Sequence, residues 1–224
     1  MRQTLGLHEG LLLLALHDRK GTVPIGSMVD MGLGGGLLAE LVLAGRVEIQ
    51  GEGRKRLVAV VDTRRFGDEL LDEALKRLRE AKRRIKPATA VHRLGRLKQL
   101  RHRVARDLCR RGVLRATEDQ ILLLFRRRVY PTVDPGPERT LVADIRGALD
   151  APGERFARIE ERTAVLVGLA HASRLLGGLY GRSELRALKP RLQALREMSP
   201  AVEATWSAVE ATEAATVAAI AAAS

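Results

Sequence analysis

The pattern of apolar and polar positions along the chain predicts a mainly helical protein. Leu, Ala, Val and Arg dominate the sequence, and these residue types favour helices. Two pairs of short β-forming segments predict small hairpins instead. We expect one helix to end near His17 and further helices at residues 37–44, 68–85, 91–111, 138–149, 155–176, 182–198 and 199–224. The expected hairpin strands are residues 46–50 with 57–61, and residues 113–115 with 121–130.

Length and composition predict one domain that spans residues 1–224. Hydrophobic residues make up 46% of the 224 residues and aromatic residues 3%, so the core should be aliphatic. No apolar run approaches the roughly 18 residues of a transmembrane helix. A membrane partner would therefore be bound peripherally. The single cysteine, Cys109, excludes an internal disulfide and fits a reducing compartment, so we expect a cytoplasmic protein.

Basic residues are concentrated in the middle of the chain. Residues 76–128 hold nineteen Lys or Arg against four Asp or Glu, a net charge of +15, whereas the whole chain carries +12. Because like charges repel, such a block is typical of a surface that meets an anionic polymer or an anionic membrane. We favour an anionic phospholipid membrane, contacted from its inner face. The Ala- and Arg-rich composition is typical of a bacterial protein.

Nucleic acid is the alternative partner. A helix at residues 37–44 followed by a hairpin is similar to a winged helix, and the isoelectric point is about 10.9. This helix has no basic face, however, and aromatic side chains for base stacking are scarce. We therefore expect nucleic acid to bind only weakly, by charge.

No catalytic or metal-binding arrangement is visible in the sequence. The glycine-rich segment 32–36 lacks the Gly-Lys-Ser/Thr of a phosphate loop, and we expect a turn or a close packing contact at a helix start. The histidines have no partners at metal-ligand spacing. His171 lies in an apolar helix and is interpreted as a core histidine. We expect a non-enzymatic protein with no metal and no cofactor.

The predicted helix 91–111 contains the strongest candidate for a binding residue. Leucine and valine side chains form one arc of its helical wheel, and Arg103 lies on the opposite, solvated face. Arg101 projects inside the apolar arc, and Lys98 lies at its edge. A charge in that position needs a partner because an unpaired buried charge is costly. Either Arg101 forms an internal salt bridge or it lines an anion pocket with Lys98.

The second predicted hairpin joins an apolar run directly to a basic one. Either the run is a buried strand, or it is an apolar tip beside a basic collar, which suits a bilayer interface or self-association. The residues are Leu122, Leu123, Leu124, Phe125, Arg126, Arg127 and Arg128.

Six segments, in order, resemble the Golgi phosphoprotein 3 family over nearly the whole chain. They are residues 5–20 (LGLHEGLLLLALHDRK), 32–47 (GLGGGLLAELVLAGRV), 70–76 (LLDEALK), 100–114 (LRHRVARDLCRRGVL), 121–125 (ILLLF) and 169–173 (LAHAS). The resemblance implies a single-domain helical bundle wrapped by amphipathic helices. It also implies a peripheral membrane protein that binds phosphatidylinositol 4-phosphate, with an unidentified protein partner.

The resemblance also points to particular residues. The family's later pair of basic pocket residues falls on Lys98 and Arg101, which the helical wheel selects independently. Its pocket Trp falls near Ile25 and its pocket Arg on Gly34, so this half of the pocket is replaced. We therefore expect a phosphorylated headgroup whose identity the sequence does not fix. The family's projecting hairpin corresponds to residues 115–130, which we expect to mediate membrane contact or homo-oligomer formation.

Overall fold

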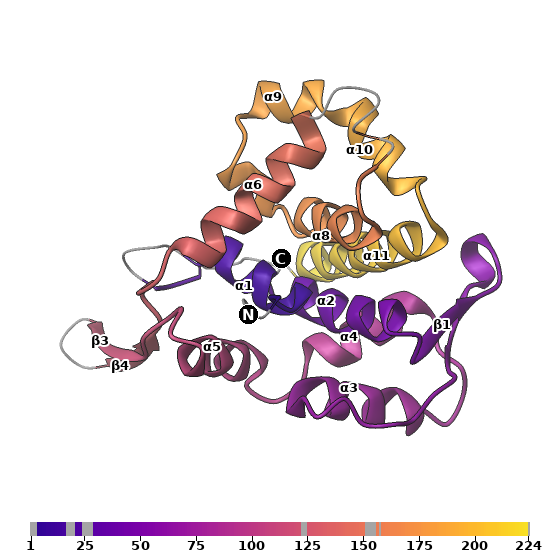
Figure 1. Cartoon of the computed structure of the whole chain (residues 1–224). Helices are drawn as coiled ribbons and strands as arrows, with labels where there is room; N and C mark the ends of the chain where they lie inside the picture. The colour runs from indigo at the N-terminus through magenta and orange to yellow at the C-terminus, as the bar shows by residue number, and fades with distance from the viewer. Residues whose placement is uncertain are drawn as a thin grey trace.

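The computed structural model describes residues 4–16, 21–23, 29–121, 125–150, 156 and 158–223. The protein is mainly helical with two separate antiparallel hairpins, as predicted (Figure 1). The helices are α1 (Leu7–Ala15), α2 (Val29–Leu43), α3 (Glu69–Arg79), α4 (Pro87–Gly95), α5 (Leu100–Arg110), α6 (Gly136–Asp150), α8 (Glu161–Ala172), α9 (Arg182–Ala187), α10 (Lys189–Arg196) and α11 (Pro200–Ala223). Short 3₁₀ turns are η1 (Gly53–Lys55) and η2 (Leu175–Gly178). Within this described part, every helix is too short or too polar to cross a bilayer.

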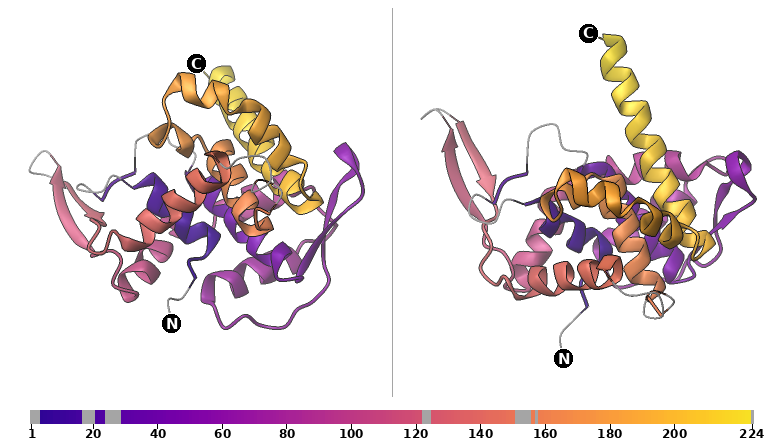
Figure 2. Two further views of the ribbon diagram at one scale, coloured as in Figure 1. Left: turned by 45° about the horizontal axis from the view of Figure 1, so that its top comes forward. Right: turned by 90° about the horizontal axis from the view of Figure 1, so that it is seen from above.

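The two hairpins differ in how they join the rest of the molecule. Strands β1 (Val47–Gln50) and β2 (Leu57–Val60) follow α2, and Val58 also bridges to Ile85. Strands β3 (Thr117–Ile121) and β4 (Phe125–Val129) project from the body, as both views of Figure 2 show. The expected strand at residues 113–115 is wrong. Its residue Leu114 makes only an isolated bridge to Thr132, and the polar segment after it pairs instead.

Several predicted helix limits are also wrong. The helix expected at 91–111 is two helices, because Gln99 adopts a left-handed conformation (φ 54°) between α4 and α5. The helix expected at 68–85 ends at Arg79, and Pro87 begins α4 rather than closing α3. The helix expected at 182–198 is divided into α9 and α10.

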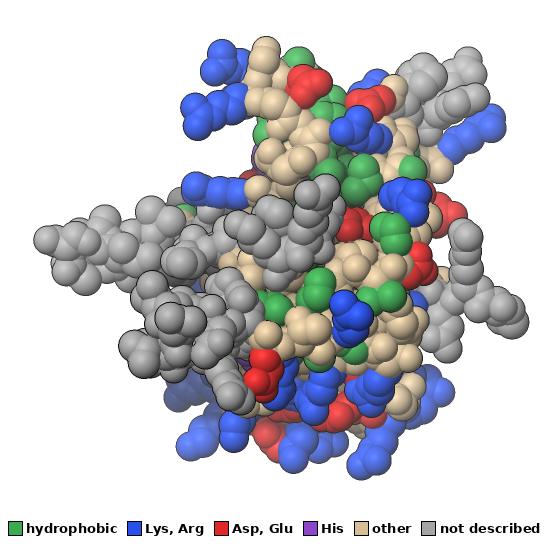
Figure 3. Space-filling view, turned by 90° about the vertical axis from the view of Figure 1, so that its left-hand side faces the viewer, with side chains coloured by type: hydrophobic (Ala, Val, Ile, Leu, Met, Phe, Trp, Pro, Cys, Tyr) green, Lys and Arg blue, Asp and Glu red, His purple; other side chains and the backbone are tan. Residues whose placement is uncertain are grey.

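The basic segment lies mostly on one end of the molecule. Lys and Arg side chains gather over the lower part of the face in Figure 3, where Figure 1 places α3 and α5, with acidic side chains between them. Part of the positive charge is therefore paired within the protein, as for Arg110 with Asp107 and Lys76 with Glu80.

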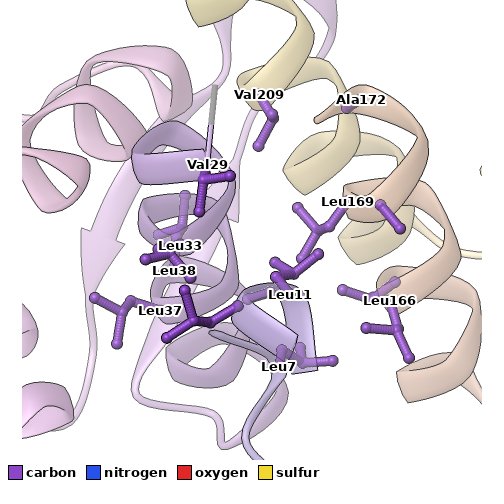
Figure 4. Packing of buried hydrophobic residues seen from close by; sticks show 14 of the residues in the cluster. Leu7, Leu11, Val29, Leu33, Leu37, Leu38, Leu166, Leu169, Ala172 and Val209 are labelled. Atoms are coloured by element: carbon purple, nitrogen blue, oxygen red, sulfur yellow. The ribbon is translucent and has the colours of Figure 1, made fainter. Parts of the chain in front are cut away.

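Helix α2 is the centre of the core. It packs against α1, α4, α8 and α11, and most of its residues are apolar and buried, with Asp30 and Glu40 as its two acidic residues. Figure 4 shows leucines of α1 and α2 facing Leu166, Leu169 and Val209 of the C-terminal helices. The aliphatic core predicted from composition is confirmed. A buried central helix is also unsuited to the role of a DNA-reading helix, which must be exposed to enter a groove.

The glycine-rich segment lies inside α2 and allows close helix contacts. A Cβ built on Gly34 would lie 2.5 Å from the backbone nitrogen of Gly95 in α4, and one on Gly36 would lie 2.8 Å from the nitrogen of His8. The close packing contact is confirmed, whereas a turn and a helix start at residue 37 are wrong, since α2 begins at Val29.

Candidate anion-binding pocket

A pocket of about 560 Å³ opens between the start of α2, the α4–α5 turn and the end of β4. Its floor is apolar and includes Leu12, Leu16, Leu97, Leu100 and Ala105. Its polar lining residues are Thr22, Asp30, Arg96, Gln99, Arg101, His102, Arg128 and Tyr130.

The contact between α2 and α4 brings these residues together. A Cβ on Gly95 would lie 2.6 Å from the carbonyl oxygen of Asp30, so the first turn of α2 lies directly against the end of α4. Gln99 then turns the chain into α5, and Leu100 at its start is buried. The next residue, Arg101, thereby faces Asp30 although 71 positions separate them in the sequence.

Arg101 forms a two-point ion pair with Asp30. Its Nε donates to Oδ1 at 2.5 Å and its Nη2 donates to Oδ2 at 2.8 Å. The hydrogen bonds to Asp30 raise the pKa of Arg101, against the opposing effect of burial. The side chains are 42% and 37% exposed, so the pair remains open to the pocket. Of the two alternatives for Arg101, the internal salt bridge is present, and the same side chain also lines a pocket.

His102 and Tyr130 form a second polar contact in the lining. The His102 Nδ1 and the Tyr130 hydroxyl are 2.9 Å apart. Burial lowers the pKa of His102, and the neighbouring charges of Arg128 and Arg101 lower it further. An anion beside His102 would act against these two charges and would favour the imidazolium form.

The charges of the lining suit an anion. Arg96, Arg101 and Arg128 supply three guanidinium groups, and Asp30 is the one acidic residue among the described lining residues. Guanidinium groups match the oxygens of a phosphate through paired hydrogen bonds. In the described ranges, no group of three or more His, Cys, Asp or Glu side chains is placed to hold a metal ion.

Lys98 and Arg101, which the sequence analysis assigns to the same pocket, lie in different surroundings in the structure. Arg101 lines the pocket, whereas Lys98 is exposed in the α4–α5 turn and is not part of the lining. Arg103 was expected on a solvated face, which is wrong: its side chain is 12% exposed. It bridges α5 to α3 through Glu73 at 2.5 Å and Glu69 at 2.9 Å.

The candidate hairpin residues are only partly within the described chain. Leu122, Leu123 and Leu124 lie outside the described residues, and the side chains of Phe125, Arg126 and Arg127 lie outside them as well. Arg128 is exposed and reaches the pocket from β4. The strand register places Glu118 opposite Arg128 and Asp119 opposite Arg127.

Sequence reasoning missed Asp30, Arg96, His102 and Tyr130. The one available signal was Arg101, because an arginine among apolar positions requires an acidic partner. His171, interpreted as a core residue, is half-buried and packs edge-on against Trp206, with ring centroids 5.3 Å apart.

Comparison with known proteins shows what the whole chain is similar to. A family model described as Golgi phosphoprotein 3 (GPP34) matches residues 7–213. A curated relative, vacuolar protein sorting-associated protein 74 of Eremothecium gossypii, is 31% identical over 153 residues, which cover 58% of this chain. The matched part spans 45% of that relative, less than half of its length.

Proposed function

This chain belongs to the Golgi phosphoprotein 3 family, and on that premise we propose that it is a non-enzymatic, peripheral membrane-binding protein. Its ligand is the phosphorylated headgroup of an anionic phospholipid, of which phosphatidylinositol 4-phosphate is the family's example. The headgroup enters the pocket at Arg101, and the surrounding basic surface contacts neighbouring lipids at the cytoplasmic face. The observation that carries this proposal is the placement of Arg101 in an open pocket with two further arginines.

The pocket arginines take the place of the family residues that the chain lacks. Gly34 stands at the family's Arg position, and its Cβ direction is filled by the backbone of Val91 and Gly95, both 2.5 Å away. Phosphate contacts therefore come from Arg96, Arg101 and Arg128 instead. Lys98, exposed next to the pocket, contacts headgroups at the membrane surface.

The test compares two single-charge variants, Arg101→Gln and Arg93→Gln, in liposome flotation. Arg93 is exposed on α4 and is not part of the lining, so it reports the general effect of one positive charge. A surface Lys or Arg contributes about 1 kcal/mol against anionic lipid, which corresponds to about fivefold in affinity. We expect a loss of about tenfold or more for Arg101→Gln, because paired charge-assisted hydrogen bonds are roughly twice as strong as neutral ones.

The vesicles are phosphatidylcholine with and without phosphatidylinositol 4-phosphate, with duplex DNA as competitor. Equal losses for the two variants would mean that charge acts diffusely and that the pocket does not bind the headgroup. A lower melting temperature with unchanged binding would assign Arg101 a structural role only. Tight, sequence-specific DNA binding would favour the nucleic-acid alternative.

A further inference from the structure

We infer that Asp30 is a specificity-determining residue of this pocket, which accepts hydrogen bonds from hydroxyl groups of a polyol headgroup while Arg101 binds the phosphate. The inference rests on the proposed function, since it concerns the same pocket. It adds the residue that would select a phosphate ester with free hydroxyl groups over one without them.

The Asp30 carboxylate can accept further hydrogen bonds besides those from Arg101. Each of its two oxygens receives one hydrogen bond from Arg101. A carboxylate offers about four lone-pair positions, so about two of them remain. The Asp30 side chain is 37% exposed and lines the pocket, so ligand groups can reach these positions.

The ion pair also leaves Arg101 able to bind phosphate. The guanidinium group has five N–H donors, and Asp30 takes one from Nε and one from Nη2. The remaining donors, including both on Nη1, are available to a phosphate oxygen. The pair therefore presents donors and acceptors side by side, and Asp30 restricts the orientation of the guanidinium group.

The other charges of the pocket favour hydroxyl over ammonium as the donor group. Among the described lining residues, Arg96, Arg101 and Arg128 outnumber the single carboxylate, so a cationic amine would be repelled. A hydroxyl group is neutral and meets no such repulsion. Headgroups such as glycerol and inositol fit these conditions better than ethanolamine.

The experiment uses two lipids that differ only in hydroxyl groups. Phosphatidylglycerol and phosphatidylpropanol each carry one negative charge and a three-carbon headgroup, and only phosphatidylglycerol has headgroup hydroxyls. Vesicles contain either lipid at the same fraction in phosphatidylcholine, and the readout is the ratio of the two affinities. For the unmodified protein we expect phosphatidylglycerol to bind about tenfold to a hundredfold more tightly, as for one hydrogen bond to a charged group.

Asp30→Ala should reduce this ratio to about one. The variant also removes a negative charge and releases Arg101, but both effects act on the two lipids alike and cancel in the ratio. Asp30→Asn keeps one acceptor oxygen. Its affinity ratio should lie between that of the unmodified protein and that of Asp30→Ala. Glu80→Gln is the matched control, since Glu80 is exposed at the end of α3 and is not part of the lining. Its ratio should equal that of the unmodified protein.

The outcomes separate this inference from the proposed function. If the unmodified protein shows no preference, or if Asp30→Ala keeps the preference, Asp30 does not recognise hydroxyl groups. If Arg101→Gln still loses binding in that case, the pocket function stands without the inference. If Arg101→Gln and Arg93→Gln lose binding equally, the pocket function itself is overturned.

Discussion

At the scale of single residues, His8 is buried where only its neutral form is well tolerated. The side chain lies in α1 and is 4% exposed, and no described group forms a hydrogen bond with its Nδ1. Burial lowers the pKa of His8 from its ordinary value of 6.5, and the charges of Glu9 and Glu40 only partly oppose this effect. His8 therefore links the stability of the core to pH.

We expect acidification to destabilise the protein through His8. The unfolded chain takes up a proton on His8 as pH falls through about 6.5, whereas the folded chain does so only at lower pH. As pH falls below about 6.5, the free energy of unfolding therefore decreases, and it stops decreasing once pH is below the pKa of His8 in the folded protein. Urea unfolding at pH 7.5 and 5.5 should show a smaller decrease for His8→Gln than for the unmodified protein. His92→Gln, at an exposed position, is the control; equal decreases in all three proteins would exclude His8 as the cause.

Of the ion pair between Arg101 and Asp30, the sequence analysis identifies Arg101 but not Asp30. Arg101 is detectable because it interrupts an apolar arc of leucines. Asp30 belongs to the first turn of a helix whose start was misplaced, and it reaches Arg101 only through the fold. Arg103 was assigned to solvent because a helical wheel does not show that α3 covers that face with Glu69 and Glu73.

At the scale of elements, the position of the pocket depends on how closely α2 approaches α4. Gly34 allows this approach, because its missing Cβ would lie 2.5 Å from backbone atoms of Val91 and Gly95. Backbone atoms cannot move aside as the end of a long side chain can. The same contact holds the first turn of α2, with Asp30, next to the start of α5.

Gly34→Ala should therefore destabilise the protein by about 1–3 kcal/mol, the usual cost of overpacking a core. Gly147→Ala is the matched control. It lies in α6, a Cβ there would meet nothing within 4 Å, and alanine in a helix is favoured over glycine by roughly 0.5–1 kcal/mol. Urea midpoints should move in opposite directions for the two variants. A stabilised Gly34→Ala protein would show that α2 and α4 separate without cost.

Helices and strands are predicted correctly where local periodicity is sufficient, and incorrectly where tertiary contacts determine the structure. Most helices and the β1–β2 hairpin follow from local periodicity, whereas the second hairpin is predicted with the wrong first strand. The break at Gln99 does not follow from periodicity, because Leu94, Leu97 and Leu100 keep helical spacing across it and all three are buried. The β3 strand was also missed, since Glu118, Asp119 and Gln120 have low β-propensity and pair because β4 lies beside them.

At the scale of the whole molecule, charge is divided unequally between the basic segment 76–128 and the rest. That segment carries a net +15 against +12 for the chain, and much of it lies on one end (Figure 3). Binding to anionic vesicles should decrease steeply as salt rises from 0.05 to 0.5 M, because added salt shortens the Debye length from about 10 Å at 0.1 M toward about 3 Å at 1 M. Flotation at several salt concentrations measures this decrease. Equal binding to neutral phosphatidylcholine vesicles would contradict an electrostatic mechanism.

The β3–β4 hairpin projects from the body of the molecule (Figure 2). We propose that its tip, residues 122–125, enters the bilayer or an interface between copies, with Arg126, Arg127 and Arg128 beside it. The test is the double variant Leu123→Asp with Phe125→Asp, which adds two charges and keeps the three arginines. A carboxylate deep in the bilayer costs on the order of 2.5 kcal/mol or more, so flotation should decrease sharply if the tip is inserted.

The same variant distinguishes the other roles of the hairpin without a membrane. If the tip packs against a second copy, sedimentation in solution should show a smaller assembly than that of the unmodified protein. Circular dichroism should show a folded protein in both cases, because the strands project from the body (Figure 2). An unfolded or insoluble variant would instead place the tip in the core. A folded variant with unchanged assembly and unchanged flotation would exclude the hairpin from membrane binding and from self-association, and the basic surface with the pocket at Arg101 would then have to hold the protein on the membrane alone.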